Sequence, residues 1–150
     1  MGGLFFEDFY VGRQFATEPV TLSEDEIIAF AQKYDPQPIH VDPAVATTSV
    51  YGGLIASGFQ TIAVAAGQWL RTGQQVGTGL GGPGLRDIRW LVPVRPGDVL
   101  HTTLEVIGAR ISRSKPDRGI LHMAYTMRND SETVVTFTVI VMMKRRLEED

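Results

Sequence analysis

The sequence of 150 residues contains no cysteine, has little net charge and lacks a long hydrophobic run. The absence of cysteine excludes disulfides, thiolate chemistry and cysteine-ligated zinc. A net charge of −3 offers no basic surface for nucleic acid. The longest apolar run, Val134 to Met143, is about half the length that a membrane-spanning helix needs. The first ten residues, MGGLFFEDFY, lack the basic and apolar segments of a signal peptide. We therefore expect a cytoplasmic protein that binds neither nucleic acid nor a membrane.

The amino-acid composition is typical of a globular protein, with 43% apolar and 21% charged residues. A chain of this length can bury a substantial core as one domain. No repeat, low-complexity segment or shift in composition marks a boundary within it. We therefore predict a single domain over residues 1–150.

The first part of the chain favours an extended segment followed by a helix. After the extended stretch Val11 to Val20, the sequence Ser-Glu-Asp-Glu at 23–26 matches a capping box. Apolar residues then recur at helical spacing, which predicts a helix ending near Tyr34. Further on, Asp42 and Pro43 resemble an N-cap and a first helical residue, so we expect a short helical turn through Thr48.

One apolar helix and four strands are predicted for the rest. The segment Ser57 to Trp69, SGFQTIAVAAGQW, contains no charge, and a helix apolar on nearly all sides must be buried on nearly all sides. Four later runs are rich in β-branched and aromatic residues and are separated by turn residues: Leu85 to Val92, Val99 to Ile107, Ile120 to Arg128 and Thr133 to Lys144. Short links between strands imply an antiparallel sheet, whose apolar face needs a cover. The pattern thus predicts an α+β fold in which a curved antiparallel sheet wraps around the helix.

The segment YDPQPIHVDPAVA at 34–46 contains the residues best suited to chemistry, Asp35 and His40. Two prolines, Pro36 and Pro38, restrict the backbone, so we expect a stiff, non-helical loop. A carboxylate and an imidazole are the groups that most often move protons near neutral pH. The alternative is an ordinary turn in which Asp35 accepts hydrogen bonds from local amides.

The start of the apolar helix supplies a second feature. Ser57 is a plausible N-cap, and the amide of Gly58 is unobstructed by a side chain and carries the partial positive charge of a helix N-terminus. Such an amide can stabilise an oxyanion or enolate. Alternatively, Gly58 only permits close packing. Together with an acid–base pair, this helix end suits the addition of water to a double bond conjugated to a carbonyl, or thioester hydrolysis.

A metal site is not expected, because the chain offers too few ligands near His40. The other two histidines, His101 and His122, fall within predicted strands and are interpreted as ordinary strand residues.

The segments DPQPIHVDPAVA and GGLIASGFQT resemble the MaoC-like dehydratase family, which includes the (R)-specific enoyl-CoA hydratases. The family pattern, Asp-x-Asn-Pro-aliphatic-His and then a small residue six positions later, is matched by Asp35, Pro38, Ile39, His40 and Ala46. Gly58 matches the glycine that begins the family's central helix. The resemblance covers most of the chain, including its FEDF opening and its SRSKPDRG loop.

The resemblance implies a hot-dog fold, a homodimer or higher homo-oligomer, and a role in fatty acid metabolism. It also implies that Asp35 and His40 hold a water for addition to an enoyl-CoA, and that Gly58, with Ser57 beside it, binds the thioester oxygen. Coenzyme A would be part of the substrate, with no separate cofactor. Two positions depart from relatives: Gln37 stands where the family has Asn, and Ala66 lacks the hydroxyl that some hydratases carry near that depth.

Two other functions remain open. Acyl-CoA thioesterases share the fold, but they more often place an Asp or Glu on the central helix, and Ser57 to Trp69 contains neither. A non-catalytic acyl-binding subunit would not need both Asp35 and His40.

A coenzyme A substrate also needs local positive charge for its phosphates. The predicted contacts are the cations of the SRSKPDRG loop and two on an earlier strand: Arg113, Lys115, Arg118, Arg86 and Arg89. The alternative is a solvated hairpin whose charges only keep the protein soluble.

Overall fold

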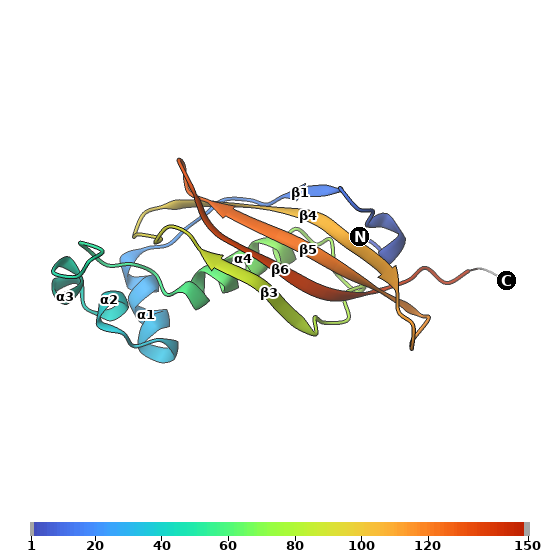
Figure 1. Ribbon diagram of the computed structural model, residues 1–150, viewed down its shortest axis with the longest axis horizontal. Coiled ribbons are helices and arrows are strands. Elements are labelled where there is room, and N and C mark those ends of the chain that lie inside the picture. The colour runs from blue at the N-terminus through green and yellow to red at the C-terminus, as the bar shows by residue number, and fades with distance from the viewer. Residues whose placement is uncertain (1, 149–150) are drawn as a thin grey trace.

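A computed structural model describes residues 2–148 and shows a sheet of long antiparallel strands curved around one long helix (Figure 1). The helices are η1 (Phe6–Asp8), α1 (Glu24–Tyr34), α2 (Pro38–Val41), α3 (Pro43–Thr47) and α4 (Gly58–Arg71). The strands are β1 (Gln14–Ala16), β2 (Val20–Thr21), β3 (Gly84–Trp90), β4 (Val99–Ile111), β5 (Arg118–Arg128) and β6 (Thr133–Lys144). The strand order is β1-β4-β5-β6-β3, with β2 also paired to β4. This is the hot-dog fold, and the predicted α+β class is confirmed.

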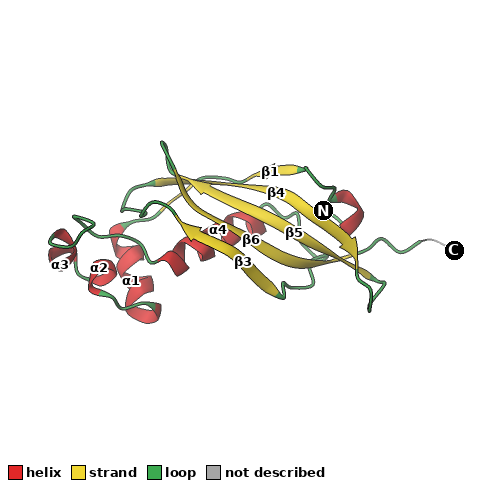
Figure 2. Ribbon diagram, in the orientation of Figure 1, coloured by secondary structure: helices red, strands yellow, loops and turns green. Residues whose placement is uncertain are grey.

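The helices α1, α2 and α3 gather beyond one end of the sheet, next to the N-terminus of α4 (Figure 2). Strand β3 ends at this same end, whereas the link between β4 and β5 lies at the opposite end. The fold therefore brings the segment 35–40, the start of α4 and the end of β3 into one region.

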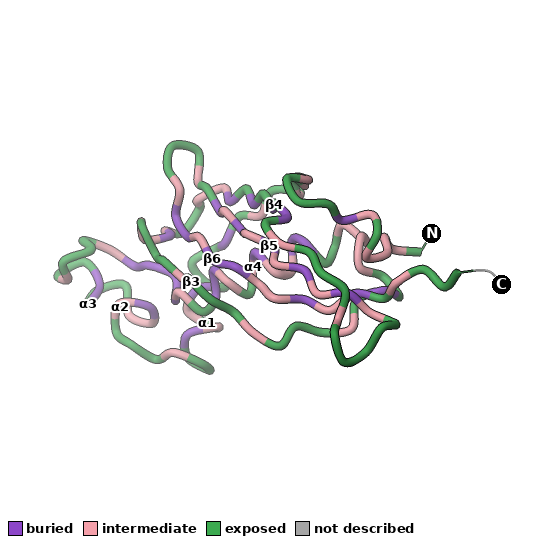
Figure 3. Tube along the Cα trace, turned by 45° about the vertical axis from the view of Figure 1, so that its right-hand side comes forward, coloured by how far each residue is buried: buried purple, intermediate pink, exposed green. Residues whose placement is uncertain are grey.

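The core lies between α4 and the inner face of the sheet. Alternate residues of β5 are buried, as the predicted period of two requires, and the same alternation runs along β4 (Figure 3). From α4, Ala65 and Trp69 reach this core, and Tyr125 stacks on Phe137 with 4.7 Å between ring centroids. Burial of these side chains is what holds the sheet against the helix.

Buried polar side chains fix the position of α4 along the sheet. The Gln68 amide donates to the carbonyls of Leu100 (2.9 Å) and Glu18 (3.0 Å), and its oxygen accepts from the Thr102 hydroxyl (2.7 Å). The Gln68 side chain thus satisfies its hydrogen bonds on β4 and on the segment before β2. In the first turn of α4, the Gln60 amide donates to the carbonyl of Glu26 in α1 (3.2 Å), and this bond ties α1 to α4.

Two predictions about the helices are wrong. Segment 35–40 is not entirely non-helical, because His40 lies in the single turn α2; Pro38 is its first residue, a position where a missing amide costs no hydrogen bond. Nor is α4 buried on nearly all sides within one chain, because the sheet covers only one face. Phe59 and Leu70, on the other face, are 63% and 54% exposed.

The predicted element boundaries shift by a few residues. The extended segment before α1 is paired only at β1 and β2. Strand β4 continues four residues past the predicted end, to Ile111, because it pairs with β5 through Gly119. No helix within residues 2–148 is both long enough and apolar enough to cross a membrane.

Candidate active site

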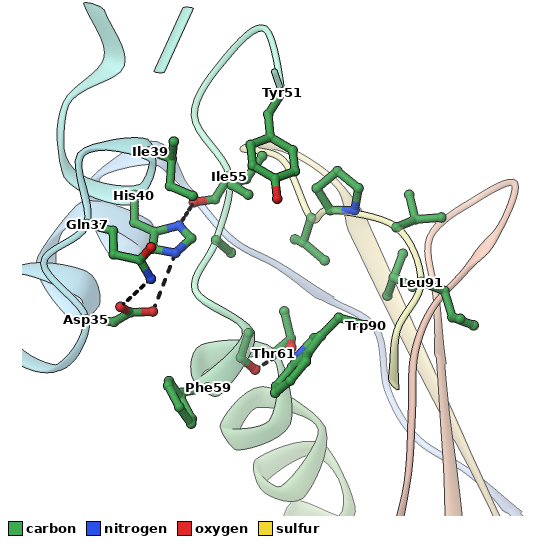
Figure 4. Close-up of a pocket in the computed structure, with 16 residues that line it drawn as sticks. Asp35, Gln37, Ile39, His40, Tyr51, Ile55, Phe59, Thr61, Trp90 and Leu91 are labelled. Carbon is green, nitrogen blue, oxygen red and sulfur yellow. Dashed lines mark hydrogen bonds and ion pairs between the residues drawn. The ribbon is translucent and has the colours of Figure 1, made fainter. Parts of the chain in front are cut away.

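The ends of three helices bring the predicted catalytic side chains together. Asp35 is the residue that ends α1, His40 lies in α2, and Ser57 is the N-cap of α4. Figure 4 shows the Asp35 carboxylate and the His40 ring facing one another beside the start of α4. The predicted pairing of these two residues in space is therefore present.

His40 is held in one orientation by the backbone. Its Nδ1 lies 2.7 Å from the carbonyl oxygen of Ile55. A carbonyl can only accept a hydrogen bond, so Nδ1 must carry a hydrogen, whatever the charge of the ring. The other ring nitrogen, Nε2, is then the one that gains or loses a proton, and it lies 3.4 Å from Oδ2 of Asp35.

Asp35 accepts hydrogen bonds from two side chains. The Gln37 amide donates to Oδ1 (2.8 Å), and the Ser57 hydroxyl donates to Oδ2 (2.7 Å). These two donors, Gln37 first, hold the pKa of Asp35 below its ordinary value of 3.8, with a smaller contribution from His40. Asp35 is therefore an ionised acceptor at neutral pH.

The pair forms a site for a hydrogen-bond donor. When His40 is neutral, both its Nε2 and Oδ2 of Asp35 present lone pairs, so they cannot bond to one another directly. A water molecule that donates one hydrogen to each atom satisfies both. Its oxygen lone pairs are then free to point away from the pair.

Gly58 presents its backbone to the same region. Within residues 2–148 its amide hydrogen has no hydrogen-bond partner, as expected for a first helical residue. The Trp90 indole lies directly against it, and a Cβ at this position would be 2.5 Å from ring atoms. Close packing thus explains the glycine, and its amide is available as a hydrogen-bond donor.

These groups line a cavity of about 560 Å³. Figure 4 shows Asp35, Gln37 and His40 on one side of it and Trp90 on another, and Gly58 also lines it. The remaining wall is mostly apolar, formed by these residues: Ile39, Tyr51, Ile55, Ala56, Phe59, Thr61, Leu91, Val92, Pro93, Val94 and Val134. A polar pair in a largely apolar cavity of this size is typical of a small-molecule site.

The structure changes the role expected for Ser57. Its side chain is fully buried and does not line the cavity, because its hydroxyl is directed at Asp35 and accepts from the Phe59 amide (3.3 Å). The Ser57 hydroxyl therefore faces the Asp35 carboxylate and not the cavity.

Sequence reasoning missed the contributions of Gln37, Tyr51 and Trp90. Gln37 was noted as a departure from the family pattern, but its contact with Asp35 depends on the bend between α1 and α2. Tyr51 and Trp90 stand in a loop and at the end of a strand, with no pattern around them to indicate a cavity.

The cations predicted to contact coenzyme A lie apart. Arg113 and Lys115 belong to the link between β4 and β5, at the end of the sheet opposite α2 (Figure 1). Arg118, at the start of β5, forms an ion pair with Asp117 (2.9 Å).

The two strand cations are no nearer to this link. In the sheet, Arg86 of β3 is in register with Thr138 in the middle of β6, so the sheet does not bring β3 to the link. Of the five, Arg89 is nearest in sequence to a cavity residue. Their contact with a nucleotide stays a prediction.

A resident metal has no candidate ligand set: residues 2–148 contain no group of three or more His, Asp or Glu side chains able to hold one.

Comparison with known proteins places the chain in a family. The family model described as "MaoC like domain" matches residues 8–127, most of the chain. The protein belongs to the MaoC-like family. The matched range includes Asp35 and His40, the donors Gln37 and Ser57 that bind Asp35, and Gly58.

Relatives within this family differ in how far they are characterised. An uncharacterised protein, YdeM of Bacillus subtilis, is 33% identical over 129 residues, covering 86% of this chain and 90% of its own length. The (R)-specific enoyl-CoA hydratase of Rhodospirillum rubrum is 33% identical over 109 residues, covering 69% of this chain and 70% of its own. The crystal structure of a MaoC-like dehydratase from Rhodospirillum rubrum has a TM-score of 0.88 and 36% identity, and covers 97% of this chain and 99% of that one.

Proposed function

We propose that this MaoC-like protein is a hydro-lyase that reversibly adds water to a 2-enoyl-CoA, giving a 3-hydroxyacyl-CoA. The observation that carries the proposal is the two-acceptor pair formed by Asp35 and His40, 3.4 Å apart, on the same cavity as the Gly58 amide. This combination supplies a site for water and a donor for the thioester oxygen. The similarity to an (R)-specific enoyl-CoA hydratase supports the same reaction.

In the proposed reaction, the water oxygen bonds to the β-carbon while one of its protons moves to Nε2 of His40. The electron pair of the double bond shifts toward the thioester carbonyl, and the Gly58 amide donates to the resulting enolate oxygen, an interaction worth roughly 3–4 kcal/mol in other enzymes. Nε2 then gives its proton to the α-carbon, which returns His40 to the neutral form. Asp35 stays ionised throughout and stabilises the imidazolium.

The proposal is tested with crotonyl-CoA, by following the loss of the conjugated-enoyl absorbance. The unaltered protein should consume it, and Asp35→Asn or His40→Gln should each lower the rate at least about a hundredfold, as for other acid–base groups. The double variant should lose little more than the worse single variant, because the two side chains act on one water. Circular dichroism of each variant controls for folding.

Other outcomes assign a different role. Release of free thiol without loss of the enoyl group would indicate a thioesterase, and binding without either reaction would indicate an acyl-binding subunit. A near-normal rate in a folded single variant would contradict the acid–base pair.

A further inference from the structure

Tyr51 forms the part of the cavity wall that lies across from the start of α4. Figure 4 shows its ring extending into the cavity, with the hydroxyl directed toward the interior, the side on which Phe59 and Trp90 lie. Tyr51 is 39% exposed, and its hydroxyl has no hydrogen-bond partner within residues 2–148. The ring is thus free to meet whatever occupies the cavity.

The backbone of Tyr51 is fastened at both of its polar groups. Arg95 donates from Nη2 to its carbonyl (2.5 Å), and its amide donates to the Ser49 hydroxyl (3.2 Å). Arg95 is itself fixed, since its amide donates to the Asp98 carboxylate (2.9 Å). The chain then turns at Gly52, whose φ of +67° is a left-handed conformation that glycine adopts without strain. These contacts hold the ring over the cavity.

The cavity wall beside Tyr51 is aliphatic and uncharged. Ile39, Ile55 and the segment Val92–Val94 meet there, held together by hydrogen bonds from the Ile55 amide to the Ile39 carbonyl (3.1 Å) and from the Ala56 amide to the Val94 carbonyl (2.8 Å). Among residues 2–148 no lysine or arginine lines the cavity, and the carboxylate that lines it is that of Asp35. A second carboxylate on the substrate would find no cation there and would be repelled by Asp35.

We propose that Tyr51 limits the length of the acyl group and that this acyl group is uncharged and aliphatic. The inference rests on the proposed function, because that function places the thioester at Gly58. From this position the acyl chain extends between the aliphatic walls to the phenol ring. A longer chain clashes with the ring and shields its hydroxyl from water without offering it a hydrogen-bond partner.

The experiment compares kcat/KM for straight 2-enoyl-CoAs of four to ten carbons, using the unaltered protein, Tyr51→Ala and Tyr51→Phe. Tyr51→Ala should raise the ratio of kcat/KM for the eight-carbon substrate over the four-carbon one by about tenfold or more, since one methylene in a pocket is worth 10- to 200-fold. Tyr51→Phe should keep this ratio near its original value, because the ring remains. The matched control is Tyr10→Ala, an exposed tyrosine outside the cavity, which should leave the ratio unchanged.

Two further measurements keep the inference falsifiable if Tyr51→Ala fails to fold. Arg95→Met should shift the ratio in the same direction by a smaller factor, because it releases the backbone of Tyr51. The unaltered protein should also favour a five-carbon 2-enoyl-CoA over the same chain ending in a carboxylate by at least about tenfold.

The outcomes separate this inference from the proposed function. If crotonyl-CoA is hydrated but Tyr51→Ala lowers kcat/KM equally at every chain length, Tyr51 contacts the shared part of the substrate and the inference is wrong, although the hydratase stands. Equal use of the carboxylated substrate overturns the uncharged pocket. If no enoyl-CoA is hydrated, both proposals fail.

Discussion

Gln37 is one of two side chains that hold the Asp35 carboxylate of the candidate site. Where the family pattern has Asn, this chain has a residue one methylene longer, whose amide reaches back to Oδ1 of Asp35 (2.8 Å). The Ser57 hydroxyl donates to the other carboxylate oxygen, Oδ2. The carboxylate is thereby kept ionised and in place, while Nε2 of His40 is left as the atom that exchanges protons.

The hydrogen bond from Gln37 should make stability depend on pH. The folded-state pKa of Asp35 lies below its ordinary value of 3.8, so this bond stabilises the protein above pH 3.8 and its contribution is lost as the pH falls through the folded-state pKa. Gln37→Leu should therefore lower the free energy of unfolding by roughly 1 kcal/mol at pH 7, and by less near pH 3. Urea unfolding at several pH values measures the difference.

The control for this prediction is Gln32→Leu, which removes an exposed amide on α1. It should change stability little at any pH. A Gln37→Leu effect that is the same at pH 7 and pH 3 would contradict the assigned hydrogen bond, and NMR titration of Asp35 would show whether its pKa rises in the variant.

At the scale of elements, the site depends on how α4 is anchored. Its N-terminus carries Ser57 and Gly58, and two glutamines farther along bind backbone carbonyls of other segments. Gln60 reaches α1, the helix that ends in Asp35, whereas Gln68 reaches β4. An apolar helix alone could slide along an apolar sheet face; these directional bonds set its position.

Replacing Gln68 by leucine should destabilise the fold. The carbonyls of Leu100 and Glu18 would lose a donor and the Thr102 hydroxyl would lose its acceptor, each in a buried or part-buried place. We expect the free energy of unfolding to fall by about 2–4 kcal/mol, measured by urea denaturation. Adding Thr102→Val should cost less in the Gln68→Leu background than alone, because the hydroxyl is already unsatisfied; strictly additive losses would show that the two side chains do not interact.

At the scale of the whole molecule, one chain leaves apolar surface uncovered. Phe59 and Leu70 are exposed on α4, and Phe59 meets the exposed Trp90 at the end of β3, with 6.3 Å between ring centroids. Strand β3 is also an edge of the sheet, with its outer backbone groups unpaired within residues 2–148. Such an edge and such a patch are usually covered by a partner. We propose that the partner is a second copy of this chain.

The expected assembly is a two-fold homodimer at micromolar concentration, measured by sedimentation velocity. A charge on the β3 edge, Leu85→Lys, should weaken it and shift the protein toward monomer. Val50→Lys is the matched control, because Val50 is 96% exposed in the turn after α3 and does not belong to the edge strand, so it should leave the assembly intact. A monomer for the unaltered protein would contradict the proposal.

The sequence by itself determined the class of fold and singled out Asp35 and His40, which the structure brings together. A charge-free helix beside four strand-length runs has few ways to bury its apolar surface, and an antiparallel sheet around the helix is one that needs only short links. Asp35 and His40 could be identified because they lie near one another in the chain and within a recognisable motif.

Tertiary structure decided what depends on contacts between distant segments. The sequence does not show that Ser57 turns to Asp35, 22 positions away, that Trp90 covers Gly58, or that Tyr51 reaches the same cavity. The tertiary structure also places the loop with Arg113 and Lys115 at the far end of the sheet. The length and register of β4 and β5 carry their link away from α2. Periodicity reports which face of an element is apolar; which side chains meet across elements follows from register, helix ends and packing.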